Sequence, residues 1–427
     1  MELSFTNRSA EMQELDAAAA VGGLVVMFGR RRVGKTRLLR HWLPTKSGLY
    51  SQAIEAATGI QLEQAMRDLG PGLKLSLVPR TWSDFFELLA MRQEPTVLCL
   101  DEFPYLAASD PSLPSVVQRW LDHQRPRQFT LVLAGSSTSA MNDCFLNRAA
   151  PLYQRARKLL QVRPMSYPAF CAACSRPPGD IESFTQFALV GGLPKYWEFL
   201  ERKSDSLDLA ETLYFGRSAF LEDEPLRLLR DEGIAGATSQ SVMEAIGRGS
   251  EKPSEIAARL GTAQTNLGRV FQHLADVSLL HRQIPFGESP RTSKRTRLAI
   301  HDPALRFWYQ VYSPHRTRWQ GYDRAQKQKL LHDHAATVFE DHCRDHHAGA
   351  ARYWEPGLEF DFVRESAGEA IVSEVNYRRL SPAERTQLEH QLSVRWQQSS
   401  LARKFLKVRF EILDARVLGA GFFPAEN

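Results

Sequence analysis

The sequence predicts an α/β fold built on a parallel β-sheet. Three apolar runs carry this prediction, and each ends in residues that bind phosphate or metal in proteins. Leu24–Phe28 leads into a glycine-rich loop, Pro95–Leu100 ends in two acids, and Phe129–Ala134 ends in serine and threonine. Helical patterns separate the runs. Strands that alternate with helices favour a parallel sheet, whose ligands bind at the carboxyl ends of the strands.

The glycine-rich loop has the spacing of a P-loop, Gly29-x-x-x-x-Gly34-Lys35-Thr36. The glycines permit a tight turn whose N–H groups point at a phosphate, and a helix expected over Lys35–Trp42 adds its positive end. We expect Lys35 to reach the β- and γ-phosphates of ATP and Thr36 to hold Mg²⁺. The strand-loop-helix context argues against a plain glycine-rich turn. The predicted nucleotide contacts in this loop are Gly29, Arg30, Arg31, Arg32, Val33, Gly34, Lys35, Thr36 and Arg37.

The ends of the other two apolar runs should lie beside this loop. Asp101 fits an outer-shell Mg²⁺ ligand, and Glu102 fits a general base that polarises the attacking water. Ser136 or Ser137 could sense the γ-phosphate through a hydrogen bond, or could belong to a simple turn. Arg155 is a candidate phosphate contact, in cis or from a neighbouring subunit, with a surface arginine as the alternative.

The segment before the first helix, Phe5-Thr6-Asn7-Arg8, has two interpretations. Short N-terminal segments of this kind often pack against the adenine base, which makes Asn7 and Arg8 candidate nucleotide contacts. The alternative is a cap on the helix expected over Ser9–Ala20.

These motifs together resemble the archaeal-type ATPases, in the STAND branch of P-loop NTPases related to AAA+ proteins. The resemblance rests on FTNR, GRRRVGKT, CLDEF, LAGSS and LYQRA, and it covers residues 1–235. It implies an ASCE, AAA+-like sheet core followed by a helical lid. In the family a Gly-Gly-x-Pro motif lies in the lid, so the resemblance adds Pro194 to the nucleotide contacts. The alternative for Gly191–Pro194 is a break between two helices.

Bulk properties fit a cytoplasmic protein of two to four domains. The chain has 427 residues, a net charge of +5 and five scattered cysteines, which suggest a reducing compartment. Its N-terminus does not resemble a signal peptide, and no apolar run approaches the roughly 18 residues of a membrane span. Cys171 and Cys174 have a redox or metal spacing but no second pair, which favours ordinary core packing.

Residues 240–300 have helix-turn-helix spacing followed by a β-ribbon, the pattern of a winged helix. Pro253–Leu260 and Ala263–Leu274 are the second and third predicted helices. Between Arg282 and Lys329 there are 11 Lys and Arg but three Asp and Glu, which would attract a phosphate backbone. The alternative is a docking or lid element for protein. The predicted DNA contacts are Gln264, Thr265, Arg269, Arg291, Lys294 and Arg295.

Residues 330–427 have a different sequence pattern from the segment before them. Family members carry a C-terminal domain that resembles the PD-(D/E)xK restriction-endonuclease fold, in which acids share Mg²⁺ and a lysine orients water. Asp361 and Glu374 match the acids and Glu340 could join them, but Asn376 occupies the lysine position. Cleavage would need a migrated Arg378 or Arg379. We therefore expect a degenerate, inactive nuclease fold, with a purely structural α/β domain as the alternative.

The resulting prediction is an ATPase switch that binds ATP and Mg²⁺ and engages DNA or a protein partner, with oligomers possible and no membrane contact. The alternatives are a scaffold that holds ATP with little turnover and an ATP-regulated nuclease. The predicted domains are an ATPase core over residues 1–165, a helical lid over 166–238, a winged helix over 239–315 and a nuclease-like α/β domain over 316–427.

Overall fold

A computed structural model describes residue 3 and residues 5–74, 77–92, 94, 96–123, 129–201, 204–217 and 219–419. Five parallel strands form a sheet in the order β2-β3-β4-β1-β5. The strands are β1 Gly23–Phe28, β2 Leu49–Gln52, β3 Thr96–Asp101, β4 Phe129–Gly135 and β5 Ala156–Gln161. The predicted parallel sheet is confirmed, although Pro95 lies outside the described residues and β5 was not predicted. Because β4 lies between β1 and β3, the glycine-rich loop and the acidic strand end flank the end of β4.

Both faces of this sheet are covered by helices, as alternating strand residues require. Leu24 and Val26 face one apolar core and Val25 and Met27 face the other. The first core is built by α3 Thr58–Leu73, α4 Trp82–Ala90, α5 Phe103–Ser109, α6 Leu113–His123 and α7 Thr138–Phe145. The second is built by α1 Ser9–Val21 and α2 Lys35–Trp42. Strands buried on both faces explain the nearly continuous apolar runs.

The triplet Gly70-Pro71-Gly72 has the composition of a helix break but does not end the helix. Helix α3 runs through this triplet and ends where Lys74 adopts a left-handed conformation with φ of 48°. Leu69 and Leu73 are buried on either side of the triplet, so the apolar stripe continues across it. Tertiary packing of this stripe outweighs the weak helix propensity of glycine and proline in the last turn.

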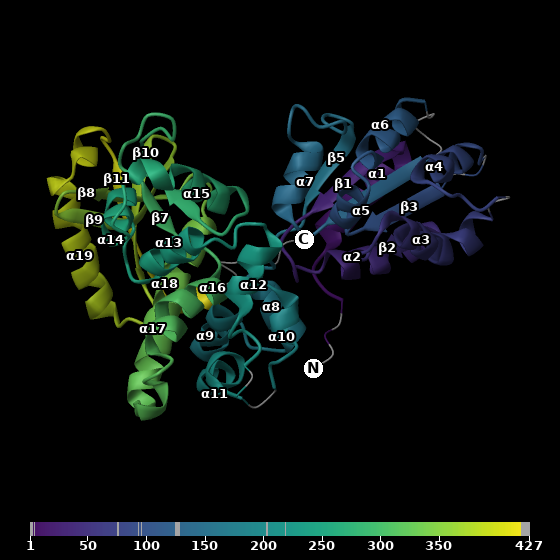
Figure 1. The fold of residues 1–427 in the computed structure, drawn as a ribbon. Helices are drawn as coiled ribbons and strands as arrows, with labels where there is room; N and C mark the ends of the chain where they lie inside the picture. The colour runs from purple at the N-terminus through teal and green to yellow at the C-terminus, as the bar shows by residue number, and fades with distance from the viewer. Residues whose placement is uncertain are drawn as a thin grey trace.

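Short helices follow the sheet and lie between the two sheets of the molecule (Figure 1). They are α8 Tyr167–Cys174, α9 Ile181–Val190, α10 Pro194–Trp197, α11 Ser206–Ala210, a π-helical turn over Glu211–Phe215 and α12 Glu224–Asp231. Cys171 and Cys174 are both buried in α8, as core packing predicts, and all five cysteines are free thiols.

Three helices and a two-stranded antiparallel ribbon occupy residues 237–299. They are α13 Ala237–Gly247, α14 Pro253–Arg259, α15 Gln264–Asp276, β6 His281–Gln283 and β7 Arg297–Ala299. Helices α14 and α15 lie within two residues of the predicted Pro253–Leu260 and Ala263–Leu274. The chain then continues through α16 Pro303–Phe307, a π-helical turn over Trp308–Tyr312 and α17 Ser313–His315, and α16 packs on α9.

The C-terminal part is a four-stranded sheet between two helices. α18 Arg324–Asp345 precedes β8 Ala351–Glu355, β9 Leu358–Ser366 and β10 Glu369–Asn376, and α19 Pro382–Gln398 precedes β11 Val408–Asp414. The order is β11-β10-β9-β8, parallel only between β10 and β11. Phe362 and Val375 face the core that contains α18, and Val372 and Phe360 face α19.

The remaining described elements are short 3₁₀ turns at Leu43–Lys46, Trp319–Gly321, Ser400–Arg403 and Ala415–Leu418. Among the helices that the structure describes, none combines the length and the apolar composition that a bilayer crossing requires.

Candidate nucleotide-binding site

The loop between β1 and α2 is shaped by its two glycines. A Cβ on Gly29 would lie 2.3 Å from the carbonyl oxygen of Val162, so no other residue fits there. Gly34 has φ of 100°, a left-handed conformation that glycine adopts without strain, and no atom lies within 4 Å of where its Cβ would be. The loop is therefore tight on the side of β5 and open around Gly34.

The Lys35 side chain curls back into this loop. Its Nζ donates hydrogen bonds to the carbonyl oxygens of Gly29 and Arg30, at 2.7 Å and 3.2 Å. Burial lowers the pKa of Lys35, while the nearby charges of Glu102 and Asp101 act to raise it. A buried ammonium with two neutral carbonyl partners still has a donor available for an anion.

Asp101 joins the loop to the acidic strand, as the sequence predicted. The Thr36 hydroxyl donates to Asp101 Oδ2 at 2.7 Å, and Asp101 is fully buried. The Tyr50 hydroxyl donates to the same oxygen at 2.8 Å, and burial together with Asp101 raises the pKa of Tyr50. Tyr50 was not predicted as a site residue, because nothing in the sequence shows that β2 neighbours β3.

Glu102 is held by the end of β4. It adopts a left-handed conformation with φ of 55°, and its Oε2 accepts from both the backbone N–H of Ser136 at 3.2 Å and the Ser136 hydroxyl at 2.9 Å. The second carboxylate oxygen, Oε1, receives no hydrogen bond from the described residues. The structure thus brings the predicted acid and the predicted sensor serine into direct contact.

The three consecutive arginines of the loop point away from it. Each pairs with a carboxylate from a distant part of the chain: Arg30 with Asp302 at 2.5 Å, Arg31 with Asp231, and Arg32 with Glu224. The guanidinium of Arg32 also lies over the Phe220 ring, 4.7 Å from its centroid. The prediction of these arginines as nucleotide contacts therefore applies to the loop backbone and not to their guanidinium groups.

The N-terminal segment supports the loop from behind. Arg8 is buried, and its Nη2 donates to the carbonyl oxygens of Val33 at 2.8 Å and Arg163 at 3.1 Å. Asn7, with φ of 55°, turns the chain before α1, and Arg37 on α2 donates to the carbonyl oxygen of Leu3. A role for Asn7 and Arg8 beside adenine stays a prediction.

Pro194 is the first residue of α10, after the Gly191-Gly192 turn. A Cβ on Gly192 would lie 2.2 Å from the Met165 carbonyl oxygen, and one on Gly191 would lie 3.7 Å from Asp302 Oδ2. Gly192 thus lets the turn approach the Met165 backbone, and Gly191 adopts a left-handed conformation with φ of 61° that glycine tolerates without strain. The glycine motif therefore acts here through packing, and a contact of Pro194 with nucleotide stays a prediction.

Arg155 lies at the wrong end of the sheet for a phosphate contact within the same chain. It immediately precedes β5, which runs parallel to β1, so it lies near the amino ends of the strands. Six residues of strand separate the two ends, about 20 Å. Its guanidinium pairs with Asp122 at 3.1 Å. The cis role is wrong, and a role in a neighbouring subunit stays a prediction.

A second group of acids, all half-buried, lies on α18 and the C-terminal sheet. Burial raises the pKa of Asp361 and the charge of Glu374 raises it further, while burial and Asp361 together raise the pKa of Glu340. Asp361 accepts from the Val375 N–H at 2.7 Å, and Glu374 accepts from Arg395 Nη2 at 2.6 Å. The described residues contain no group of three or more His, Cys, Asp or Glu arranged to hold a metal ion.

Both predicted replacements for the missing lysine have partners other than these acids. Arg378 donates to Glu384 at 2.6 Å, and Arg379 donates to the Gly179 carbonyl oxygen at 3.2 Å. Asn376 lies opposite Asp414 in the register of β10 and β11. The cation that meets Glu374 is instead Arg395 on α19, a residue that sequence spacing does not reveal.

Replacing Asp361 with asparagine is expected to reduce the loss of stability at high pH. The folded state keeps a proton that the unfolded chain releases near pH 4, so stability falls as pH rises from about 4 through the raised pKa. Asparagine does not titrate and can still accept the Val375 hydrogen bond. The drop in melting temperature between about pH 5 and 8 should shrink by a few degrees, since one pKa unit corresponds to about 1.4 kcal/mol.

Asp333→Asn on the exposed face of α18 is the control for this substitution. If stability depends on pH in Asp361→Asn as it does in the unmodified protein, the raised pKa of Asp361 is not the cause of the loss of stability.

The predicted DNA contacts divide into two groups. Gln264, Thr265 and Arg269 are exposed on α15, and Arg291 and Lys294 are exposed in the loop between β6 and β7. Arg295 instead pairs with Glu288 and donates to the Trp354 carbonyl oxygen at 2.8 Å.

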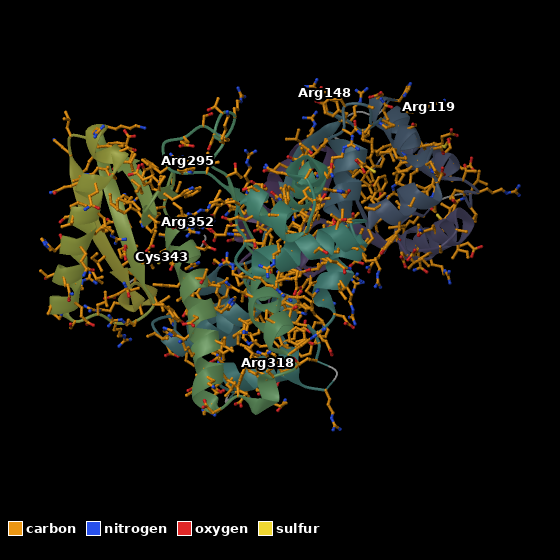
Figure 2. All side chains as sticks on the ribbon, turned by 60° about the vertical axis from the view of Figure 1, so that its left-hand side comes forward. Arg119, Arg148, Arg295, Arg318, Cys343 and Arg352 are labelled. Atoms are coloured by element: carbon orange, nitrogen blue, oxygen red, sulfur yellow. The ribbon has the colours of Figure 1, made fainter. Side chains whose placement is uncertain are left out.

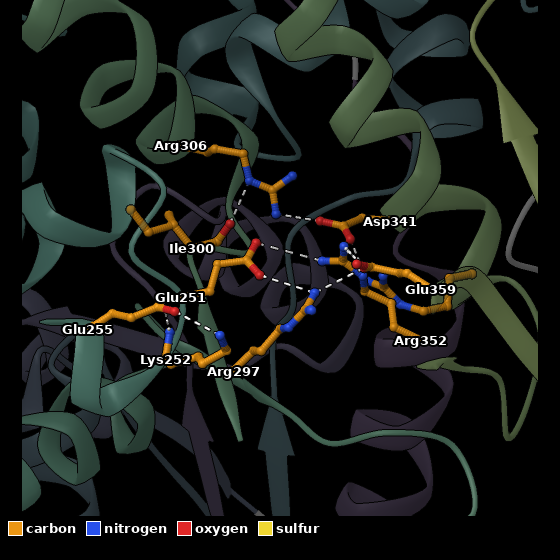
Figure 3. Close-up of polar contacts among 10 residues, drawn as sticks. Glu251, Lys252, Glu255, Arg297, Ile300, Arg306, Asp341, Arg352 and Glu359 are labelled. Carbon is orange, nitrogen blue, oxygen red and sulfur yellow. Dashed lines mark hydrogen bonds and ion pairs between the residues drawn. The ribbon is translucent and has the colours of Figure 1, made fainter. Parts of the chain in front are cut away.

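The ribbon is docked on the C-terminal sheet through charged side chains. Arg297 on β7 pairs with Glu251 at 3.3 Å and with Glu359 on β9 at 3.0 Å, and Arg352 on β8 pairs with the same two acids at 3.9 Å and 2.5 Å (Figure 3). The Phe286 N–H also donates to the Arg352 carbonyl oxygen at 2.8 Å. This face of the ribbon is therefore not available to another molecule.

Comparison with known proteins identifies the family of the domain that contains the nucleotide site. A family model described as the ATPase domain predominantly from Archaea matches residues 5–199, which include the loop, Asp101, Glu102 and the Gly-Gly-x-Pro motif. The chain contains an archaeal-type ATPase domain. The chain is also 25% identical over 321 residues to MJECL04, an uncharacterized protein of Methanocaldococcus jannaschii, covering 73% of this chain and 69% of that protein.

Among solved structures, one similarity supports the fold of this chain. The Walker-type ATPase PABY2304 of Pyrococcus abyssi is similar with a TM-score of 0.53 and 17% identity, covering 72% of this chain and 96% of that one. The ORC2 protein of Aeropyrum pernix, in ADPNP and ADP complexes, has a TM-score of 0.43 and 13% identity, with coverages of 78% and 95%. The first similarity supports the P-loop NTPase fold of the ATPase domain.

Proposed function

We propose that this protein is a Mg²⁺-dependent, ATP-hydrolysing switch of the STAND type that couples its nucleotide state to DNA. The observation that carries the proposal is the hydrogen bond from Thr36 to Asp101, with Glu102 next in the chain. It joins the residue expected to hold the metal to the acids expected to complete its site. The archaeal-type ATPase domain supports nucleotide hydrolysis in general.

The residues present fit ATP and Mg²⁺. The glycine loop leaves open space at Gly34, and among the described residues the buried Lys35 ammonium has only carbonyl oxygens as hydrogen-bond partners. Thr36 and Asp101 supply the hydroxyl and carboxylate oxygens that Mg²⁺ prefers. When bound, the metal would neutralise charge on the phosphates.

The chain's own residues would then act as follows. Lys35 exchanges its loop carbonyls for phosphate oxygens, and the loop N–H groups and the start of α2 hold the phosphates in place. Glu102 accepts a proton from the attacking water through its free Oε1, while Ser136 fixes the orientation of the carboxylate through Oε2. Asp101 keeps Thr36 in position and is itself fixed by Tyr50.

The three arginine–carboxylate pairs supply a route from the nucleotide to the rest of the chain. Glu224 and Asp231 belong to α12 in the lid, and Asp302 caps α16 by accepting from the Leu305 N–H at 2.7 Å. Any change in the loop is therefore transmitted to the lid and to the segment after the ribbon. The proposed units remain a core over residues 1–165, a lid over 166–238, a winged helix over 239–315 and an inactive nuclease-like domain over 316–427.

DNA is the proposed partner because α15 presents exposed polar and basic side chains in the arrangement of a recognition helix. The ribbon is held by Glu251 and Glu359, so α15 and the exposed Arg291 and Lys294 would make the contact. A protein partner on the same surface is the other outcome. Inactivity of the C-terminal acids is supported by Arg395, which already neutralises Glu374.

The proposal is tested by ATP turnover with Mg²⁺ against duplex DNA, single strands and no nucleic acid, across a salt series. Turnover that requires Mg²⁺ and changes with duplex DNA at low salt supports it. Absence of Mg²⁺-dependent nucleotide binding contradicts the whole proposal. If nucleic acid does not change the rate of ATP turnover at any salt concentration, the result contradicts the proposed coupling to DNA and favours a protein partner.

Replacing Arg269 with alanine is expected to weaken duplex binding several-fold and to reduce the slope of log affinity against log salt by about 1. Arg119→Ala is the matched control, because Arg119 is an exposed arginine on α6 of the ATPase domain, well separated from Arg295 (Figure 2). Fluorescence anisotropy of a labelled duplex, measured across a salt series, gives both the affinity and its salt dependence. Equal losses in the two variants would show that only net charge matters.

A further inference from the structure

One buried carboxylate in the lid contacts the helix that follows the sensor serine. Glu232, directly after α12, is 8% exposed. Its Oε1 accepts from the Thr138 N–H at 3.3 Å, and its Oε2 accepts from the Ser139 N–H at 3.2 Å and from the Ser137 hydroxyl at 3.5 Å. A carboxylate at the start of a helix is stabilised by the unpaired N–H groups and the helix dipole.

The segment that Glu232 holds also carries the contact to Glu102. Ser136 donates twice to Glu102 Oε2, and the next three residues are the ones that donate to Glu232. Gly135 leaves little room for movement before them, because a Cβ there would lie 2.8 Å from Pro104 and 2.6 Å from Met141. The position of Ser136 is thus fixed by close packing on one side and by Glu232 on the other.

We propose that Glu232 is a positioning residue that ties the lid to the orientation of Glu102. The inference rests on the proposed ATPase function. Asp231, its neighbour, pairs with Arg31 of the glycine loop, so one end of α12 contacts both the loop and the segment after β4. Displacement of α12 therefore changes the loop and the Ser136–Glu102 contact together.

Glu232→Gln in the full-length protein separates this role from simple stability. Glutamine has the same shape but loses the charge, and its amide nitrogen cannot accept an N–H. We expect kcat to fall about tenfold with KM changed less than about threefold, because the base is misoriented while the phosphate cradle is intact. Amide hydrogen exchange over residues 135–145 should become faster in the variant.

Glu182→Gln is the matched control. Glu182 is a half-buried carboxylate in the proposed lid that also contacts the start of a helix, since it accepts from the Ser206 N–H and, at 3.1 Å, from the Ser206 hydroxyl. None of its described partners lies in the ATPase sheet or the glycine loop. It should leave kcat and the exchange over residues 135–145 unchanged. Equal effects of the two variants would overturn the proposal, as would unchanged kcat and exchange in Glu232→Gln.

A third outcome also overturns the proposal. A higher kcat with a lower KM in Glu232→Gln would mean that Glu232 competes with phosphate for the α7 N–H groups. Absence of turnover in the unmodified protein would contradict the proposed function instead. Hydrogen exchange needs no turnover, so it still decides whether Glu232 holds the segment.

Discussion

Replacing Glu102 with glutamine is expected to abolish ATP turnover and to leave ATP binding intact. Glutamine keeps an oxygen that can accept the two Ser136 hydrogen bonds, so the local geometry is preserved. It cannot take a proton from water, and loss of a general base typically costs about 10²–10⁴-fold in rate. Single-turnover phosphate release measures the first effect and calorimetric titration with ATP measures the second.

Glu63→Gln is the control for this substitution, because Glu63 is exposed on α3. Full turnover in Glu102→Gln would remove Glu102 from the proposed role. Tight ATP binding without turnover in the unmodified protein would favour the scaffold alternative. Loss of ATP binding in Glu102→Gln would instead point to a structural role for this carboxylate beside Lys35.

Replacing Asp302 with alanine is expected to destabilise the protein by about 3–5 kcal/mol, with about 1 kcal/mol more from the lost helix cap. The side chains of Asp302 and Arg30 are 6% and 12% exposed, so the substitution leaves a nearly buried guanidinium without its partner. Asp302 also accepts the Leu305 N–H that starts α16. Denaturant unfolding followed by tryptophan fluorescence measures the loss.

Two further variants separate the ion pair from the cap. Asp302→Asn can keep the cap but loses the charge, so it should cost less than the alanine variant. The double variant Arg30→Met with Asp302→Ala removes the unpaired charge and should recover part of the stability, as coupled neighbours do. Costs that simply add in the double variant would show that the pair contributes nothing beyond its separate groups.

Local sequence patterns predicted the nucleotide cradle well, because the chemistry lies within short stretches. Helix α2 begins and ends where Lys35–Trp42 was expected, and Asp101 meets Thr36 as the strand order of such sheets requires. The edge strand β5 was missed because Arg157 and Lys158 interrupt its apolar pattern. An edge strand is partly exposed to water, so it can carry charged residues, and these interrupt the apolar pattern by which a strand is predicted.

The partners of the loop arginines could not be predicted from sequence. Arg31 and Asp231 are 200 positions apart, and no periodicity links them. The three arginines looked like phosphate ligands because they stand inside a phosphate-binding motif. Their pairing with Glu224, Asp231 and Asp302 depends on how the lid folds back on the loop, which is tertiary structure.

The apolar core that begins at α1 and α2 runs without interruption through the lid helices to α18 and reaches Phe362 and Val375 of the C-terminal sheet. The 195 residues that match the family model therefore end inside a shared interior and not at a surface seam. Domains are exchanged most easily where few contacts cross their boundary, and this core joins the described elements from β5 to α18. Exchanging the part after α12 would therefore keep the core intact only if helices α8–α12 were exchanged with it.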